Sequence, residues 1–193
     1  MKKTIAAILL LSVCLCSLFA CGTKHPIDEL RESIIDEKNA QITISLSDIP
    51  LFGSMQITTK VDGDKTYTSG VFGSSETYTE VKGDTVYTYA KDDDGNWKKT
   101  SEKADASKDT GMVSGDEMDV LFNSENYTQS KDDENKYFMK EDVVLDGYSE
   151  ITLTIIENGC IIEGKMNSEG FVYTMKMTFS NIGSTKITLP EVK

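Results

Sequence analysis

The sequence has few of the residues from which catalytic and metal sites are commonly built. Its 193 residues include one histidine, His25, and one arginine, Arg31. A single histidine close to the N-terminus makes a histidine-based triad or zinc site difficult to assemble. Gly-x-Ser-x-Gly, Walker and dinucleotide-binding motifs are absent, and the acidic turn at 92–96 lacks the spacing of a calcium loop. We therefore expect a protein that is not an enzyme and that needs neither a cofactor nor a metal.

Cysteine is scarce, and long apolar runs occur only at the N-terminus. Two of the four cysteines, Cys14 and Cys16, lie in that run, which leaves Cys21 and Cys160 for the rest of the chain. A disulfide scaffold is therefore not expected, and Cys160, in an apolar segment, is predicted to be a small buried side chain. No later stretch of about 20 apolar residues predicts a transmembrane helix.

Positive charge is also in short supply. The chain carries 20 basic and 32 acidic residues, a net charge of -12. Such a surface repels phosphate backbones, which argues against nucleic acid as a partner. It also repels anionic headgroups, so a protein of this charge needs an anchor to stay at a membrane.

The first twenty residues have the pattern of a secretion signal. Lys2 and Lys3 are followed by an almost wholly apolar stretch at 5–19, and the small residue Ala20 comes next. An apolar run this short behind basic residues is typical of a signal peptide and not of a membrane span. We expect residues 1–20 to be removed.

The four residues Leu18-Phe19-Ala20-Cys21 resemble the lipobox of bacterial lipoproteins. The resemblance implies cleavage between Ala20 and Cys21 and a diacylglyceryl group on the Cys21 thiol. The alternative is a plain cleaved signal in which Cys21 is incidental. With two or more acyl chains, the protein would be stably held on a bilayer. The tether at 21–25 is short, since four residues after Cys21 reach at most about 14 Å.

Residues 26–193 are predicted to form one domain of mostly β structure. An amphipathic helix is expected at 26–38, where Asn39 can end it in a left-handed conformation. Alternating apolar residues between Gly and Asp turns then predict a meander to about residue 99. A polar loop at 101–111, a short helix begun by a capping box at Ser114 and an irregular stretch at 124–136 follow. A second meander is expected from Tyr137, with a short strand at 143–145 and a last one at 187–189.

These elements predict an α+β fold of about nine to ten antiparallel strands, in which most strands are apolar on one side only. Two short helices can cover only part of that apolar face. Either the sheet curls on itself, or an apolar surface remains for a ligand. The candidate lining consists of the inward side chains, among which methionine is frequent and suits a pliable surface. These residues are Met55, Ile57, Met118, Leu121, Phe122, Met166, Phe171, Tyr173, Met175 and Met177.

Several short motifs resemble lipoproteins of the LolA/LppX-like superfamily. They are the hairpins at 63–67 and 83–87, with Gly-Asp-x-x-Tyr in each, the strand start at 95–98 and the terminal segment at 187–190, together with the lipobox and the first helix. The resemblance implies a strongly curved antiparallel sheet, an incomplete barrel, wrapped around helices. It also implies an apolar cavity on the concave side.

Together these features predict a lipid-anchored protein on the extracytoplasmic face of a cell membrane. The single arginine and Gly22 after Cys21 favour a Gram-positive cell. Its partners would be the membrane, through acylated Cys21, and a lipid or lipopeptide held in the concave face. The alternative is a non-catalytic envelope protein with a filled core and a functional outer surface.

We expect the mature protein to stay with the membrane fraction through washing in salt buffer, because acyl chains and not charges hold it there. Fractionation followed by mass analysis of Cys21 checks this. Release of protein that still carries Cys21 would contradict the anchor.

Overall fold

The structure is a computed structural model that describes residues 24–36, 38–49, 53–70, 76–104, 115–168 and 170–192. The expected signal peptide, Ala20, Cys21 and the capping residue Ser114 lie outside these residues. The described part is mostly β, as predicted, and has few helices. It contains eleven strands in one antiparallel sheet, one or two more than expected.

The elements fall into two meanders with short helices before each. The first half contains α2 (Pro26–Arg31), the π-helical turn η1 (Glu32–Asp36), β1 (Asn39–Ile49), β2 (Gly53–Asp62), β3 (Lys65–Ser69), β4 (Thr77–Lys82), β5 (Thr85–Lys91) and β6 (Trp97–Lys103). The second contains α3 (Gly115–Leu121), the 3-10 turn η2 (Ser124–Asn126), β7 (Tyr127–Gln129), β8 (Lys136–Met139), β9 (Tyr148–Ile156), β10 (Gly159–Ser168) and β11 (Phe171–Ser180).

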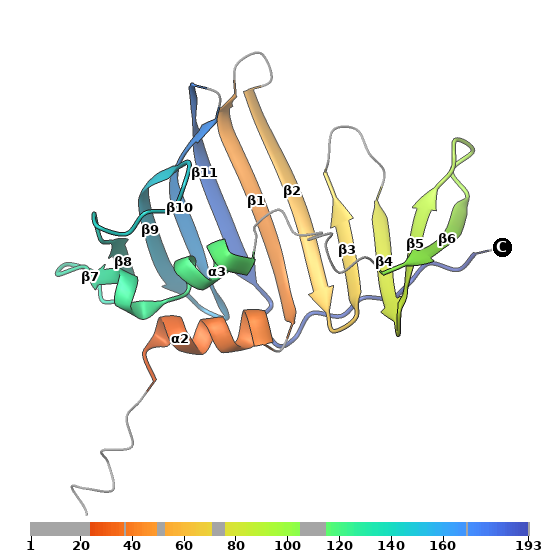
Figure 1. The fold of residues 1–193 in the computed structure, drawn as a ribbon, viewed down its shortest axis with the longest axis horizontal. Helices are drawn as coiled ribbons and strands as arrows, with labels where there is room; N and C mark the ends of the chain where they lie inside the picture. The colour runs from red at the N-terminus through yellow and green to blue at the C-terminus, as the bar shows by residue number, and fades with distance from the viewer. Residues whose placement is uncertain are drawn as a thin grey trace, which may run out of the picture.

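Strand order across the sheet is β6-β5-β4-β3-β2-β1-β11-β10-β9-β8-β7. Each half of the chain is thus a meander of sequential neighbours, and the pairing of β1 with β11 joins the two halves (Figure 1). In that register Ile44 of β1 lies between Ile57 of β2 and Met177 of β11. The strand order leaves β6 and β7 as the two edges, so the sheet is not closed.

The first helix is shorter than predicted and begins at the expected residue. Pro26 takes the first helical position, where its missing N–H costs nothing, and the N–H of Ile27 donates to Nδ1 of His25 over 3.3 Å. His25 therefore acts as the N-cap and not merely as part of a tether. The prediction that Asn39 ends the helix is wrong, since Lys38 takes the left-handed conformation (φ 48°) and Asn39 already begins β1.

Both helices pack on one face of the half formed by β1 and β9–β11 (Figure 1). Ile27 and Phe122 are fully buried there, and the Phe122 ring meets Phe179 of β11 edge-on with centroids 5.1 Å apart. The carboxylate of Asp28 accepts hydrogen bonds from the N–H of Ser124 (3.2 Å) and from its hydroxyl (2.8 Å). These bonds fix α2 against the segment that follows α3.

Four other local predictions are corrected. Residues 101–103, expected in a loop, extend β6, and β7 forms within the stretch 124–136 that was expected to be irregular. The strands expected at 143–145 and 187–189 do not form. Instead the C-terminal segment runs along the lower ends of the strands in Figure 1, where the N–H of Ile187 donates to Asp62 of β2 over 3.1 Å.

We expect Phe122→Ala to lower the free energy of unfolding by about 3–5 kcal/mol, because it removes a fully buried ring from the contact between α3 and the sheet. Val144→Ala, at a side chain that is 85% exposed, is the control and should change it by less than about 0.5 kcal/mol. Urea titration measures both. Equal effects would contradict the placement of α3.

Candidate ligand-binding cavity

A cavity of about 620 Å³ lies where β8 separates from β9. The pairing of these strands ends at Phe138 opposite Thr152, whereas β9 extends to Tyr148 along β10. Between them the chain makes the loop 140–147. The cavity is a half-open space between that loop and the first part of β9.

The loop is held in place by backbone hydrogen bonds at both of its ends. At its start, the N–H of Lys140 donates to the carbonyl of Asn126 over 2.9 Å. At its end, Gly147 has a φ of 79°, and its carbonyl accepts from the N–H of Asn167 over 2.7 Å. The positive φ favours glycine here, and a Cβ at Gly147 would make a tight contact of 3.3 Å with the Asn167 carbonyl oxygen.

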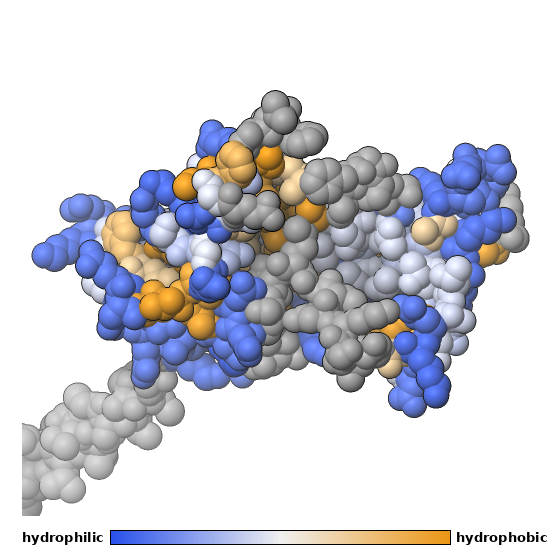
Figure 2. All heavy atoms as spheres, turned by 45° about the horizontal axis from the view of Figure 1, so that its top comes forward, coloured by the Kyte–Doolittle hydropathy of each residue, from blue (hydrophilic) through white to orange (hydrophobic). Residues whose placement is uncertain are grey.

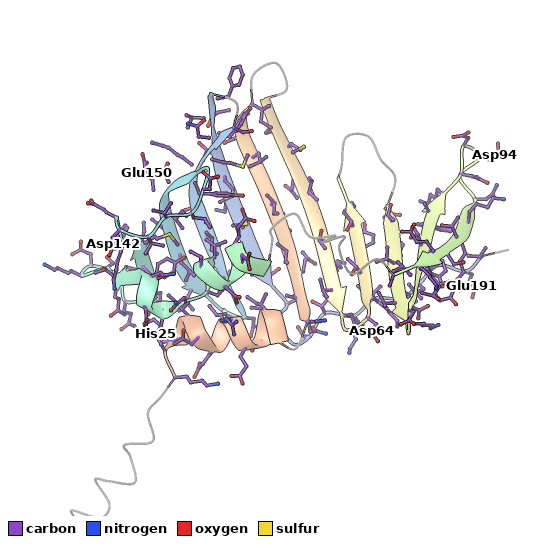
Figure 3. The ribbon with its side chains drawn as sticks, viewed as in Figure 1. His25, Asp64, Asp94, Asp142, Glu150 and Glu191 are labelled. Carbon is purple, nitrogen blue, oxygen red and sulfur yellow. The ribbon has the colours of Figure 1, made fainter. Side chains whose placement is uncertain are left out.

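A β-bulge shapes the sheet side of the cavity. The register between β9 and β10 shifts at this point, and Glu150 takes a positive φ of 54°. Its carboxylate pairs with Lys165 of β10 over 2.6 Å. Figure 3 places Glu150 and Asp142 at the same end of the sheet, opposite the end that carries Asp94.

The lining combines an apolar floor with a polar rim. Leu145 and Ile151 are buried members of the core cluster, and Met139 and Tyr148 pack against that cluster. The other lining residues are Phe138, Lys140, Glu141, Val143, Ser149, Glu150 and Thr152. Five of the eleven lining residues are polar or charged, so the cavity has a mixed lining, although its volume of several hundred cubic ångströms is within the range of small-molecule sites.

Tyr148 reports on the solvation of the cavity. Burial raises the pKa of its phenol above the usual 10.0, and the negative charge of Glu117 in α3 acts in the same direction. A ligand that displaces more water from the phenol would raise this pKa further.

The ten predicted lining residues occupy a different place. Ile57, Leu121, Phe122, Met175 and Met177 are buried, and the last four belong to the core cluster. Met118 packs against that cluster and is partly buried, whereas Phe171 is 52% exposed. None of the ten lines either of the two cavities described here.

The register nevertheless brings several of the ten together. Leu46 of β1 separates Met55 from Met175, and Tyr173 pairs with Met166 at the far end of β10 and β11. The alternation thus identified one face of the sheet. It did not identify the cavity, whose floor residues Leu145 and Ile151 were assigned to strands. The sequence feature that could have indicated the cavity is the apolar triplet at 143–145, which lies within an otherwise polar stretch.

A second, smaller cavity of about 310 Å³ lies between α2 and the β9–β10 hairpin. Its apolar lining includes Leu30, Ile155 and Ile182. Cys160, on the same hairpin, is fully buried, as predicted, and burial raises the pKa of its thiol. A thiol in that state is unreactive.

Within the part of the chain that the structure describes, no three His, Cys, Asp or Glu side chains are grouped so that they could hold a metal ion. The helices of that same part are too short or too polar to cross a membrane.

Comparison with known families and curated proteins found no match.

We expect the Tyr148 phenol to ionise at a higher pH than a solvated tyrosine. The difference in ultraviolet absorbance between wild type and Tyr148→Phe, followed across alkaline pH, isolates this group. Glu117→Gln should lower the pKa of Tyr148 towards 10.0 without removing the burial effect. A Tyr148 pKa at or below 10.0 in the wild type would contradict the placement of Tyr148.

Proposed function

We propose that this protein is a lipid-anchored, non-catalytic lipoprotein of the extracytoplasmic face of a cell membrane that binds a hydrophobic ligand, such as a lipid or lipopeptide. The observation that carries the proposal is the cavity between β8 and β9, with its apolar floor of Leu145 and Ile151. The signal pattern and the lipobox resemblance support an anchor that would hold the folded body beside a bilayer, which supplies such ligands.

Two residues of the cavity floor, Leu145 and Ile151, belong to the buried core of the domain. Met175 and Met177 belong to the same core cluster, so an acyl chain that extends from the cavity towards the predicted lining face would have to displace packed core side chains. Methionine side chains are flexible enough to move aside for a guest. The ligand would thus enter at the β8–β9 end and not through the middle of the sheet.

In this proposal the sheet is curved, an incomplete barrel of the LolA/LppX-like kind, and wraps around α2 and α3. Two features support it: both helices pack on the same face, and the strand order does not close. Figure 2 shows apolar side chains gathered mainly on the half that carries the helices, whereas the surface over β3–β6 is mostly pale or blue.

The alternative is an envelope protein with a filled core and no ligand. The observation that favours it is the contact of Phe122 with Phe179, which fills the space between α3 and β11. In that case the cavity holds only water, and the outer surface carries the function.

Protein purified from its own membrane should carry bound lipid that native mass spectrometry detects as added mass. Val143→Trp, which fills the cavity from its loop, should abolish that added mass. Val144→Trp is the matched control, since the neighbouring side chain is 85% exposed and does not line the cavity.

Wild-type protein that is consistently free of bound lipid would reject the carrier function and favour the alternative. Loss of lipid from both tryptophan variants would place the ligand elsewhere on the protein.

A further inference from the structure

One face of β2–β6 combines aromatic rings with lysines, and we call it the lysine–aromatic face. Because side chains alternate along a strand, the pairing register decides which residues share this face. Its members are Lys60, Lys65, Tyr67, Tyr78, Lys82, Tyr87, Tyr89, Lys91, Trp97, Lys99 and Lys103.

The centre of this face is a single cross-strand row. Lys60 pairs with Tyr67, Tyr67 with Tyr78, Tyr78 with Tyr89, and Tyr89 with Lys99. Three tyrosines in the middle of the row are therefore bounded by one lysine at each end. Five strands at about 4.8 Å spacing give the row a length of about 19 Å.

The rings contact one another across the strands. The centroids of Tyr67 and Tyr78 are 4.9 Å apart with tilted planes, and those of Tyr78 and Trp97 are 5.4 Å apart, edge to face. Such contacts restrict ring motion, so the rings form a pre-organised surface.

The lysine side chains lie over these rings. Nζ of Lys99 is 4.1 Å from the Tyr87 centroid and 5.2 Å from that of Tyr89, and Nζ of Lys60 is 5.4 Å from the Tyr67 centroid. The ammonium groups are thereby held at the ring surface. Lys91 lies over Trp97 at 5.0 Å and also pairs with Glu76 over 3.3 Å.

Positive charge is in excess on this face of an acidic protein. Six lysines share it with three carboxylates, those of Asp62, Glu76 and Glu80, although the whole chain carries a net charge of -12. A hydrogen bond from Lys82 holds the pKa of Glu80 below its usual 4.5, and the charges of Lys99 and Lys65 act in the same direction.

The opposite face of the same strands has a different chemistry. It presents uncharged threonines along β3–β5, among them Thr66, Thr68, Thr79 and Thr88. Along β2–β5 the register thus places the lysine and aromatic side chains on one side of the sheet, whereas Lys98 of β6 lies on the other side. Solvation alone does not explain this one-sided arrangement, since water would solvate a lysine equally well on either face of the strands.

Much of the lysine–aromatic face is accessible in the described structure. Lys82, Lys91, Lys99 and Lys103 are exposed, and Tyr67, Tyr78, Tyr87 and Trp97 are half-buried. The C-terminal segment runs along the lower ends of the strands, where Figure 3 shows Glu191 below β5 and β6. Within the central row, Tyr89 is buried and Lys60 is half-buried.

We propose that the lysine–aromatic face binds an anionic polysaccharide. Sugar rings present flat C–H surfaces that pack on aromatic faces, and their carboxylates accept charge-assisted hydrogen bonds from lysine. The row provides both at regular spacing, with ammonium groups at each end.

Two other anionic partners fit less well. A membrane surface is contacted by aromatic side chains that project into it, whereas these rings are half-buried and packed against each other. Nucleic acid is disfavoured because the proposed extracytoplasmic location separates it from the protein. The inference depends on the proposed function only for this last point, since the face lies at the other end of the sheet from the cavity.

Trp97 is the single tryptophan of the chain and reports binding directly. Full-length protein in detergent micelles, titrated with polygalacturonate, should show a saturable change in tryptophan emission that weakens as salt is raised. Dextran, a neutral polysaccharide, should produce no change at the same concentrations. The outcome for lipid in the cavity does not affect this measurement.

Lys99→Gln should weaken polygalacturonate binding on the order of tenfold, as loss of one charge-assisted contact predicts, and Lys60→Gln tests the other end of the row. Lys98→Gln is the matched control, because Lys98 precedes Lys99 on the opposite face of β6, and it should change the affinity less than about twofold. Circular dichroism of each variant verifies the fold.

Absence of an emission change with polygalacturonate would overturn the proposal, as would an equal response to dextran. Tighter binding to oligo-dT would assign the face to nucleic acid. A response to phosphatidylglycerol vesicles without one to polygalacturonate would assign it to a membrane surface.

Discussion

The pairing of β1 with β11 is the contact on which the rest of the structure depends. Each half of the chain can form its meander from neighbouring strands alone, but only this pairing, from Gln41 with Ser180 to Ser47 with Thr174, makes one sheet of the two. It closes a loop of more than a hundred residues, so its strand pairing must offset a large loss of chain entropy. The apolar row from Ile57 through Ile44 to Met177 provides that stabilisation, because it continues the core across the junction.

The two halves of the sheet differ in what covers their faces. Over β1 and β9–β11, α2 and α3 exclude water, and the core there is apolar. Over β3–β6 the structure places no described helix, and these strands are apolar on neither face. One face carries threonines, and the other carries tyrosines whose rings pack against each other beneath lysine stems. Long amphipathic side chains can cover a sheet surface that has no second layer.

Local signals in the sequence predicted much of the fold. The turns at Gly63 and Gly83 and the Asn158-Gly159 hairpin are correct, because positive φ at Gly63, Gly83 and Asn158 is encoded by the residue itself. Predictions failed where pairing partners and not local pattern decide. The polar residues of β6 form a strand because they pair with β5. Residues 187–189 form no strand, and the Ile187 N–H donates instead to the carboxylate of Asp62. The LolA/LppX-like resemblance included an expected last strand that ends at 187–190, and these residues form no strand.

Candidate sites differ in how far the sequence determines them. Alternation assigns side chains to a face, and it correctly grouped Met55, Met175 and Met177, but the packing of Phe122 over that face is a tertiary contact without a local signal. The cavity arises from the divergence of β8 from β9, which no periodicity in the sequence predicts.

The lysine–aromatic face could not be recognised in the sequence for a related reason. Its lysines and rings are spread over residues 60–103, and only the register of five strands brings Lys60 and Lys99 into one row. The net charge of the chain depends only on its composition, whereas binding depends on where the charges lie on the surface. An acidic protein can therefore carry a local surface with an excess of lysines.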